Sequence, residues 1–269
     1  MPKAQSPKPK AFLDPRAQSQ KPKHATTCSR TIVPMTATWK PAAESLVADL
    51  RNVFGDRLLA VVAYGAPIEG AVNAPLTCLA LVATLSAEDL QACAHLTRRW
   101  SRAQMATPLI LPSHEFMRSL DIFPLEYGEI IRAHELVYGD NPFSSATIAQ
   151  EDLRRACELQ AKSHLVHLRE AFIESGGRPT DVAELVTTSA PAFTQLLRNV
   201  ARLNSVTISD RGEVTRAGAR AAGIAEELVA DMLNLERQPR IAAADPSRLF
   251  PEYLAAVEQL ARAVDGWRA

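Results

Sequence analysis

The side chains best suited to bind a ligand include two histidines, His164 and His167, in a segment whose apolar residues recur at helical spacing. A separation of three residues places both imidazoles on one face of a helix, and Cys157 shares that face. Imidazole and thiolate groups bind metals, and protonated imidazole attracts phosphate. The same residues also suit ordinary packing and solvation of a helix. We therefore assign no metal to this face and take His164, His167 and nearby Arg169 as candidate ligand-binding residues.

A glycine turn provides the second candidate site. The apolar run at 58–64 ends at Gly65 and Ala66, which could approach a ligand closely. The loop and the second apolar run that follow contain no Asp or Glu from residue 70 to residue 87. We take Gly65 and Ala66 as candidate ligand-binding residues, in a region without carboxylates for a cation.

Three glutamates outside the second apolar run could still lie near this turn. Glu69 follows the turn, and Glu126 and Glu129 lie in the segment that closes the first half of the chain. If these acids met in one cleft, they could replace the missing metal ligands. Surface exposure, packing or helix capping explains them equally well. Glu126 is taken as a further candidate ligand-binding residue.

The elements that must position these residues begin with short strands and helices. Ser86, followed by two acids, is a helix N-cap. Almost continuous apolar runs indicate strands that are covered on both faces. The resulting predictions are helices at 42–54, 87–102 and 114–120, strands at 58–64, 78–85 and 107–112, and a short helix or strand at 128–139.

From residue 148 onward the pattern is helical throughout. Gly218 and Gly223 weaken the third of the expected helices, and Pro191 could kink the second. Short connections predict an up-and-down bundle, and Asn141-Pro142 marks a domain boundary near residue 145. The expected helices occupy 151–175, 180–203, 215–238 and 246–267.

Composition excludes several classes of protein. The 269 residues are 47% hydrophobic and 22% charged, which is ordinary for a soluble globular protein. The net charge is zero, so nucleic acid is not an expected partner. The longest apolar runs are too short for a membrane helix. The four cysteines form no C-x-x-C pair, and no secretory signal is visible, which together indicate the cytoplasm.

Residues 1–34 differ in composition from the rest. They contain seven Lys and Arg, one acid and six prolines. Such a segment cannot bury enough apolar surface to fold by itself, so we expect a disordered basic tail. Contact with an acidic partner and a true start at Met35 are alternatives that the sequence leaves open.

The strand, glycine turn, loop and strand resemble the start of a nucleotidyltransferase domain that carries a helical C-terminal domain. The resemblance rests on three stretches and extends over roughly residues 36–260. These stretches are Ala63-Tyr64-Gly65-Ala66, Cys78-Leu79-Ala80-Leu81-Val82, and the segment from Phe123-Pro124-Leu125-Glu126-Tyr127 to His134-Glu135-Leu136-Val137-Tyr138-Gly139. It continues more weakly through Leu165-Val166-His167-Leu168-Arg169.

The resemblance implies the α+β class: a small mixed β-sheet with helices at 36–145, followed by an all-α helical bundle at 148–269. In that family an Asp-x-Asp or Asp-x-Glu motif on the second strand holds two Mg²⁺ ions, which stabilise the attacking and leaving oxygens. Here residues 75–80 read Pro-Leu-Thr-Cys-Leu-Ala, and residues 109–111 also lack an acid. We therefore predict a degenerate site without catalytic residues, metal or cofactor, with Mg²⁺ involved only if relocated carboxylates restore the activity.

Other catalytic signatures are missing from the sequence. No histidine follows an arginine at the spacing used by the ribonuclease-type helical partners of such domains. There is no Gly-x-Ser-x-Gly and no glycine-rich phosphate loop. We expect a binding or regulatory module that holds a nucleotide or small molecule in the cleft between its domains and could form a homo-oligomer. An active nucleotidyltransferase with relocated carboxylates and a structural, dimerising protein without a ligand remain open.

Overall fold

The computed structural model describes residues 39–65, 67–68, 74–206, 208, 210–237 and 246–267. Every described residue belongs to one compact unit, Ala37–Ala269. The predicted tail, the alternative start at Met35, and Ala66 and Glu69 lie outside the described residues. The predicted domain boundary near residue 145 stays a prediction.

A mixed sheet with the strand order β3-β2-β1-β4 forms the first half of the described chain. β1 (Leu58–Tyr64) pairs antiparallel with both β2 (Thr77–Val82) and β4 (His134–Gly139). β3 (Leu109–Pro112) pairs parallel with β2, and such a pair needs a crossover, which contains the helix α2 (Ala87–Arg102). The predicted strands are confirmed, with ends that shift by up to three residues.

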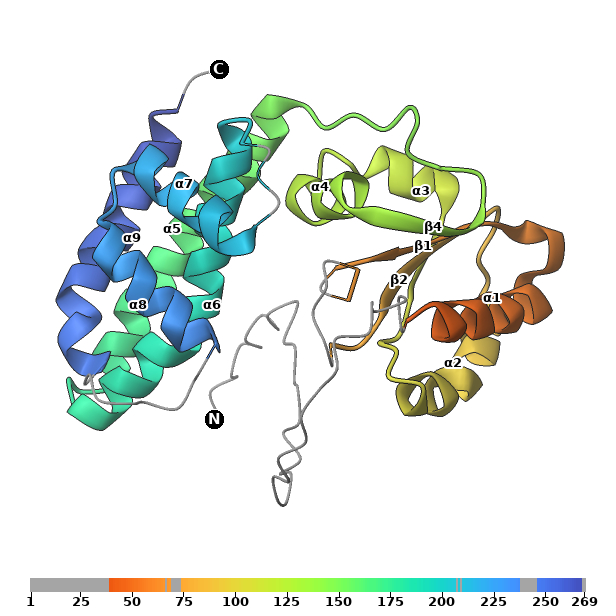
Figure 1. Cartoon of the computed structure of the whole chain (residues 1–269), viewed down its shortest axis with the longest axis horizontal. Coiled ribbons are helices and arrows are strands. Elements are labelled where there is room, and N and C mark those ends of the chain that lie inside the picture. Colours follow the sequence, from red (N-terminus) through yellow and green to blue (C-terminus); the bar gives the residue numbers. More distant parts are fainter. Residues whose placement is uncertain are drawn as a thin grey trace, which may run out of the picture. The chain divides into compact units, whose positions relative to one another are not determined.

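Helices cover both faces of this sheet (Figure 1). α1 (Lys40–Phe54) and α2 lie on one face, and α3 (Ser113–Arg118) and α4 (Pro124–Arg132) lie on the other. Because side chains alternate along a strand, Cys78 and Ala80 belong to the core under α1 and α2, whereas Leu79 and Leu81 belong to the core under α3 and α4. Burial on both sides explains why the strands are almost continuously apolar.

Ser86 caps the N-terminus of α2, as the sequence predicts, and the structure shows that the cap is a reciprocal capping box. The Ser86 hydroxyl accepts a hydrogen bond from the Asp89 backbone N–H, and the Asp89 carboxylate accepts one from the Ser86 backbone N–H. Arg57, just before β1, also donates to both Asp89 carboxylate oxygens, at 2.7 and 2.8 Å. This guanidinium holds the pKa of Asp89 well below its usual range. The start of α2 is thereby fixed to the start of the central strand.

The segment predicted as a short helix or strand at 128–139 contains the end of α4 and all of β4. Gly139 ends β4 with a φ of 77°, in the left-handed region that favours glycine. A Cβ at this position would lie 2.0 Å from the Leu59 carbonyl oxygen. Glycine therefore permits the close approach of β4 to β1.

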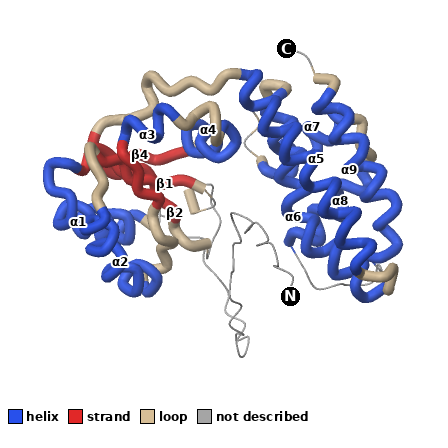
Figure 2. The backbone as a smooth tube through the Cα atoms, turned by 180° about the vertical axis from the view of Figure 1, so that it is seen from behind, coloured by secondary structure: helices blue, strands red, loops and turns tan. Residues whose placement is uncertain are grey.

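Within residues 150–237 and 246–267, five α-helices form a bundle (Figures 1 and 2). α6 contacts all four of the other helices, so it forms the centre of the bundle core. Pro191 lies inside α6 without ending it. Within the described residues no helix is long and apolar enough to cross a membrane. The helices are α5 (Gln150–Glu174), α6 (Pro179–Leu203), α7 (Arg211–Ala222), α8 (Glu226–Arg237) and α9 (Phe250–Asp265).

The prediction of one continuous third helix at 215–238 is wrong. Gly223, with a φ of 70°, ends α7, and α8 begins at Glu226. Gly218 has a packing role. A Cβ there would lie 1.8 Å from the Leu197 carbonyl oxygen of α6, so the missing side chain allows α7 to pack against the α6 backbone.

Helix α4 contributes to two hydrophobic cores. Leu125 packs in the bundle core, whereas Tyr127 and Ile130 pack in the core between α4 and the sheet. Glu129, between them, accepts a hydrogen bond of 3.4 Å from Gln195 in α6. The short helix therefore joins the sheet half of the chain to the bundle.

Candidate functional site

The predicted glycine turn lies at the end of β1. Gly65 has a φ of 79°, and the cross-strand partner of Tyr64 is Thr77. The Thr77 hydroxyl donates a 2.5 Å hydrogen bond to the Tyr64 carbonyl oxygen, and a Cβ on Gly65 would lie 2.9 Å from that hydroxyl oxygen. The hydroxyl that begins β2 is therefore engaged in closing the turn.

The rest of β2 offers no oxygen ligand for Mg²⁺. Its side chains from Cys78 to Val82 are each at most 2% exposed. Burial raises the pKa of the Cys78 thiol to about 12, so this soft group stays protonated at neutral pH. Mg²⁺ binds hard oxygen ligands, so these residues do not fit the metal pair that the family resemblance implies. In the part of the chain that the structure describes, no three His, Cys, Asp or Glu side chains could together hold a metal ion.

The acids of α4 lie in different surroundings. Glu126, the predicted candidate, is exposed. Glu129, almost one turn later, accepts from Gln195 and forms ion pairs with Arg132, at 3.3 Å, and with Arg202 of α6. Glu129 therefore holds α4 against α6.

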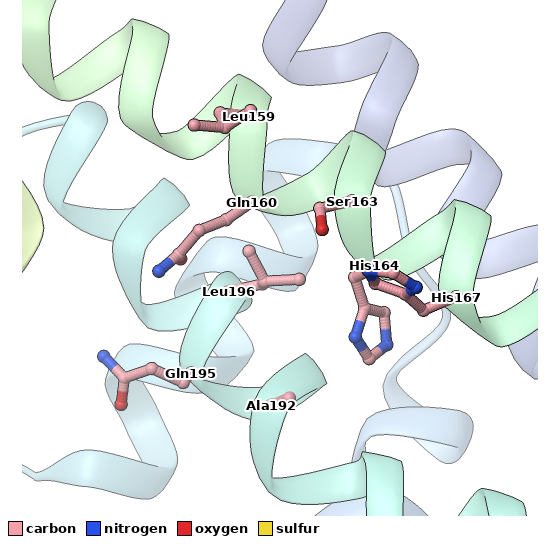
Figure 3. Close-up of a pocket in the computed structure, with 8 residues that line it drawn as sticks. All are labelled: Leu159, Gln160, Ser163, His164, His167, Ala192, Gln195 and Leu196. Carbon is pink, nitrogen blue, oxygen red and sulfur yellow. The ribbon is translucent and has the colours of Figure 1, made fainter. Parts of the chain in front are cut away.

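A groove of about 650 Å³ lies between α5 and α6 (Figure 3). None of its lining side chains is an acid, a lysine or an arginine. The groove therefore offers amides, a hydroxyl and two imidazoles beside an apolar surface. Its lining consists of Leu159, Gln160, Ser163, His164 and His167 from α5, and Ala192, Gln195 and Leu196 from α6.

His164 is the most strongly perturbed group of this groove. Its Nε2 lies 2.8 Å from the hydroxyl oxygen of Tyr253 in α9. Burial, and in smaller part the nearby His167, lower the pKa of His164 to about 4. Its imidazole is therefore neutral at pH 7 and has one donor and one acceptor nitrogen. Cys157 does not join this group because it lies in the bundle core, where burial raises its thiol pKa to about 12.

Behind the groove, a chain of polar contacts runs along α6. Asn199 donates to Gln160 Oε1 at 3.1 Å and accepts from Gln195 Nε2 at 3.1 Å. Arg198 Nε donates to Gln195 Oε1 at 3.0 Å, and its guanidinium also reaches Glu236 of α8. Asn199 is 1% exposed and Arg198 is 6% exposed, so these contacts satisfy polar groups that cannot reach water. Both groove amides are thereby held in fixed orientations.

The six predicted binding residues do not lie in one place. His164 and His167 both line the groove, as their helical spacing predicts. Arg169 instead donates to Glu258 of α9 at 2.7 Å, while Gly65 and Glu126 belong to the sheet half. Ala66 lies outside the described residues.

Sequence reasoning missed the groove residues Gln160, Ser163 and Gln195. Gln160 lies four residues before His164, a spacing that could have placed it on the histidine face. Gln195 lies on a different helix, and no pattern in the sequence connects it to α5.

A second cavity, of about 400 Å³, lies between α4 and the ends of α5 and α6. Its lining is largely apolar, with Ile131, Ile148 and Leu153 among its residues. The arginines that also line it, Arg132 and Arg202, both form ion pairs with Glu129. Gln150 and Ser205 also line it, so this cavity, like the groove between α5 and α6, offers polar groups beside an apolar surface.

No protein-family model and no curated protein matches this chain. Among solved structures, the chain is similar to spectinomycin adenyltransferase AAD(9) from Enterococcus faecialis, which was crystallised with ATP and spectinomycin. The TM-score is 0.53 and the sequence identity 12%, with 84% of this chain and 98% of that chain covered. The fold is nucleotidyltransferase-like. The predicted α+β class is confirmed, and a likeness at this identity concerns the fold alone.

Proposed function

We propose that this chain is a nucleotidyltransferase-fold protein without metal-dependent transfer at the usual site, and that it acts as a binding or regulatory module. Its ligand is a nucleotide or another small molecule that contacts the groove between α5 and α6. Gln160, His164 and His167 provide the hydrogen bonds.

The observation that carries this proposal is the burial of β2. Two-metal transfer needs carboxylates that bridge both ions at fixed positions. The strand instead places Cys78 and four aliphatic side chains in the two cores beside the sheet. A carboxylate substituted at any of these positions would be buried among apolar groups, which costs several kcal/mol. The burial of residues 78–82 is therefore our reason for proposing that metal-dependent transfer is absent at the usual site.

The chemistry of the groove supports a small polar ligand. At neutral pH a ligand would meet the amide of Gln160, the hydroxyl of Ser163 and the neutral imidazole of His164, beside the aliphatic surface of Leu159 and Leu196. The polar contacts behind the groove fix the orientation of Gln160 and Gln195 before any ligand binds. The similar adenyltransferase was solved with ATP and spectinomycin, so both compounds are suitable probes.

Calorimetric titration of ATP, GTP and spectinomycin, each with Mg²⁺ and with EDTA, tests the proposal. We expect at least one of these probes to bind with the same affinity in both buffers. Gln160→Ala should weaken that binding about tenfold, the loss of one or two hydrogen bonds. The matched control is Gln91→Ala, at an exposed glutamine of α2, which should leave the affinity unchanged.

Two other outcomes would replace the proposal. Mg²⁺-dependent transfer of an adenylyl group that is lost in Glu126→Gln would indicate an active enzyme with relocated carboxylates. Absence of binding for all three probes at millimolar concentration would indicate a structural protein.

A further inference from the structure

The hydrogen bonds behind the groove run in one direction because they begin at an arginine. A guanidinium only donates hydrogen bonds, and that of Arg198 is buried. Its Nε therefore requires the oxygen of the Gln195 amide, 3.0 Å away. Its Nη1 donates to the hydroxyl oxygen of Thr215, whose own proton is engaged with the Arg211 carbonyl oxygen. A group that cannot accept a hydrogen bond thus fixes the orientation of the Gln195 amide.

The direction passes from Gln195 to Asn199 and then to Gln160, and we call these three residues the amide chain. Because the Gln195 oxygen accepts from Arg198, its Nε2 donates to Asn199 Oδ1, at 3.1 Å. The Asn199 oxygen is then engaged, so its Nδ2 donates to Gln160 Oε1, also at 3.1 Å. Each amide therefore sets the orientation of the next.

Two further charged groups require the same direction. The Glu129 carboxylate only accepts, and it lies 3.4 Å from Gln195 Nε2. The Arg202 guanidinium only donates, and it lies 3.4 Å from Asn199 Oδ1. Reversed amides would bring donor against donor or acceptor against acceptor at these contacts. Asn199 is 1% exposed, so water could not relieve such a mismatch.

Gln160 presents the end of the amide chain to the groove. Its Oε1 accepts from Asn199, and its Nε2 has no acceptor among the residues that the structure describes. Gln160 lines the groove, and Figure 3 shows its amide on the same side as that of Gln195, away from the two imidazoles. The group offered to a ligand at this place is therefore an N–H donor.

We propose that Gln160 is a specificity-determining residue of the groove, and that the ligand group beside it is a hydrogen-bond acceptor: a carbonyl oxygen, a ring nitrogen or a phosphate oxygen. Arg198 and Asn199 are positioning residues that act through Gln160. The inference rests on the proposed function because it concerns the same groove.

The amide chain is what makes this site selective. An isolated glutamine can turn its amide and accept from an amino group as readily as it donates to a carbonyl. Here turning the Gln160 amide would place its Nε2 against the Asn199 Nδ2, two donors without an acceptor. A ligand with a donor at this place is therefore rejected, because a buried polar group would lose its partner.

NMR of the side-chain amides tests the direction without a ligand. In wild type the amide protons of Gln160 should exchange rapidly with water, whereas those of the buried Asn199 should be protected. Asn199→Asp replaces the donor to Gln160 by a carboxylate of the same shape, which only accepts. The Gln160 amide should then turn, and its proton exchange should slow by about tenfold or more. Protected Gln160 amide protons in wild type, or unchanged exchange in the variant, overturn the inference.

Calorimetry with ATP, GTP and spectinomycin tests the role in recognition. A probe that binds wild type should bind about tenfold more weakly to Asn199→Asp and to Gln160→Ala. The double variant should lose no more than either single one, because both changes remove the same donor. If the new charge acted on the ligand directly, Asn199→Asp would weaken binding in the Gln160→Ala background as well. The matched control is Asn52→Asp, at an exposed asparagine of α1, which should bind as wild type does.

The outcomes separate this inference from the proposed function. A probe whose affinity Asn199→Asp leaves unchanged, or losses that multiply in the double variant, would overturn the inference and leave the proposed function in place. Absence of binding for all three probes would contradict the proposed function, and with it the recognition role of Gln160. Circular dichroism establishes that each variant is folded.

Discussion

Lowering the pH from 7.5 to 4.5 should cost the native state roughly 2–3 kcal/mol through His164 alone. Burial beside Tyr253 lowers the pKa of this imidazole from its ordinary 6.5 to about 4. Between these two values the unfolded chain binds a proton that the native chain does not. The stabilisation from neutral His164 is therefore fully present above pH 6.5 and is lost as the pH falls towards 4.

The measurement is urea unfolding of wild type and His164→Gln at several pH values between 4.5 and 7.5. Glutamine keeps a hydrogen-bonding group near Tyr253 but cannot take up a proton. Carboxylates also titrate in this range, so the informative quantity is the difference between the two proteins at each pH. At pH 7.5 His164→Gln should be less stable than wild type because its packing is altered. Between pH 7.5 and pH 4.5 wild type should lose roughly 2–3 kcal/mol of unfolding free energy more than the variant does. The difference between the two proteins should therefore shrink or change sign.

A control variant separates this effect from the general response to acid. His95→Gln replaces an exposed histidine of α2 and should leave the pH dependence of the unfolding free energy as in wild type. If His164→Gln and wild type lose stability in parallel over the whole range, His164 is not a buried neutral base and the reasoning is wrong.

Three further predictions concern packing, charge and thiol reactivity. Gly218→Ala should reduce the free energy of unfolding by about 3 kcal/mol or more, because its Cβ would lie 1.8 Å from a backbone oxygen of α6. Gly128→Ala, whose Cβ would meet only an Ile148 methyl at 3.2 Å, should change it by less than about 1 kcal/mol, and an equal loss in both variants would contradict the argument. Arg198→Ala should cost about 3 kcal/mol in urea unfolding, because the partly buried Glu236 loses its ion-pair partner. By comparison, Arg220→Ala removes an exposed pair with Glu226 and should cost less than about 1 kcal/mol. Iodoacetamide at pH 8 should modify Cys78 and Cys157 in the denatured chain but not in the native one, because burial raises both thiol pKa values to about 12. Mass spectrometry reads the result, and equal rates in both states would show that these thiols are accessible.

The sequence predicts the sheet well because its signals are local. Residues 58–64 are almost continuously apolar, and five of the seven are buried because helices cover both faces of the sheet. Ser86 with Asp89 forms the cap that its side-chain chemistry favours. The split between α7 and α8 was missed because a helix tolerates glycine, and only the left-handed backbone of Gly223 shows that the helix ends there.

The groove could be predicted only in part. His164 and His167 share a helix, so their spacing places them together. Gln195 reaches the same groove from α6, and that contact depends on how the two helices pack. The polar row of α6 is a further example. In the sequence, a solvent-exposed face is suggested by the polar side chains of Gln195, Arg198 and Asn199. In the structure Arg198 and Asn199 are buried, because their hydrogen-bond partners come from three other helices.

The two cores that share α4 have a thermodynamic consequence. Unfolding of the bundle would remove the core contacts of Leu125, and unfolding of the sheet half would remove those of Tyr127 and Ile130. Neither core can be lost without weakening the nine-residue helix that supports the other. Heating should therefore produce one cooperative heat-absorption peak in calorimetry, and a fragment cut near residue 145 should melt at a lower temperature than the intact chain.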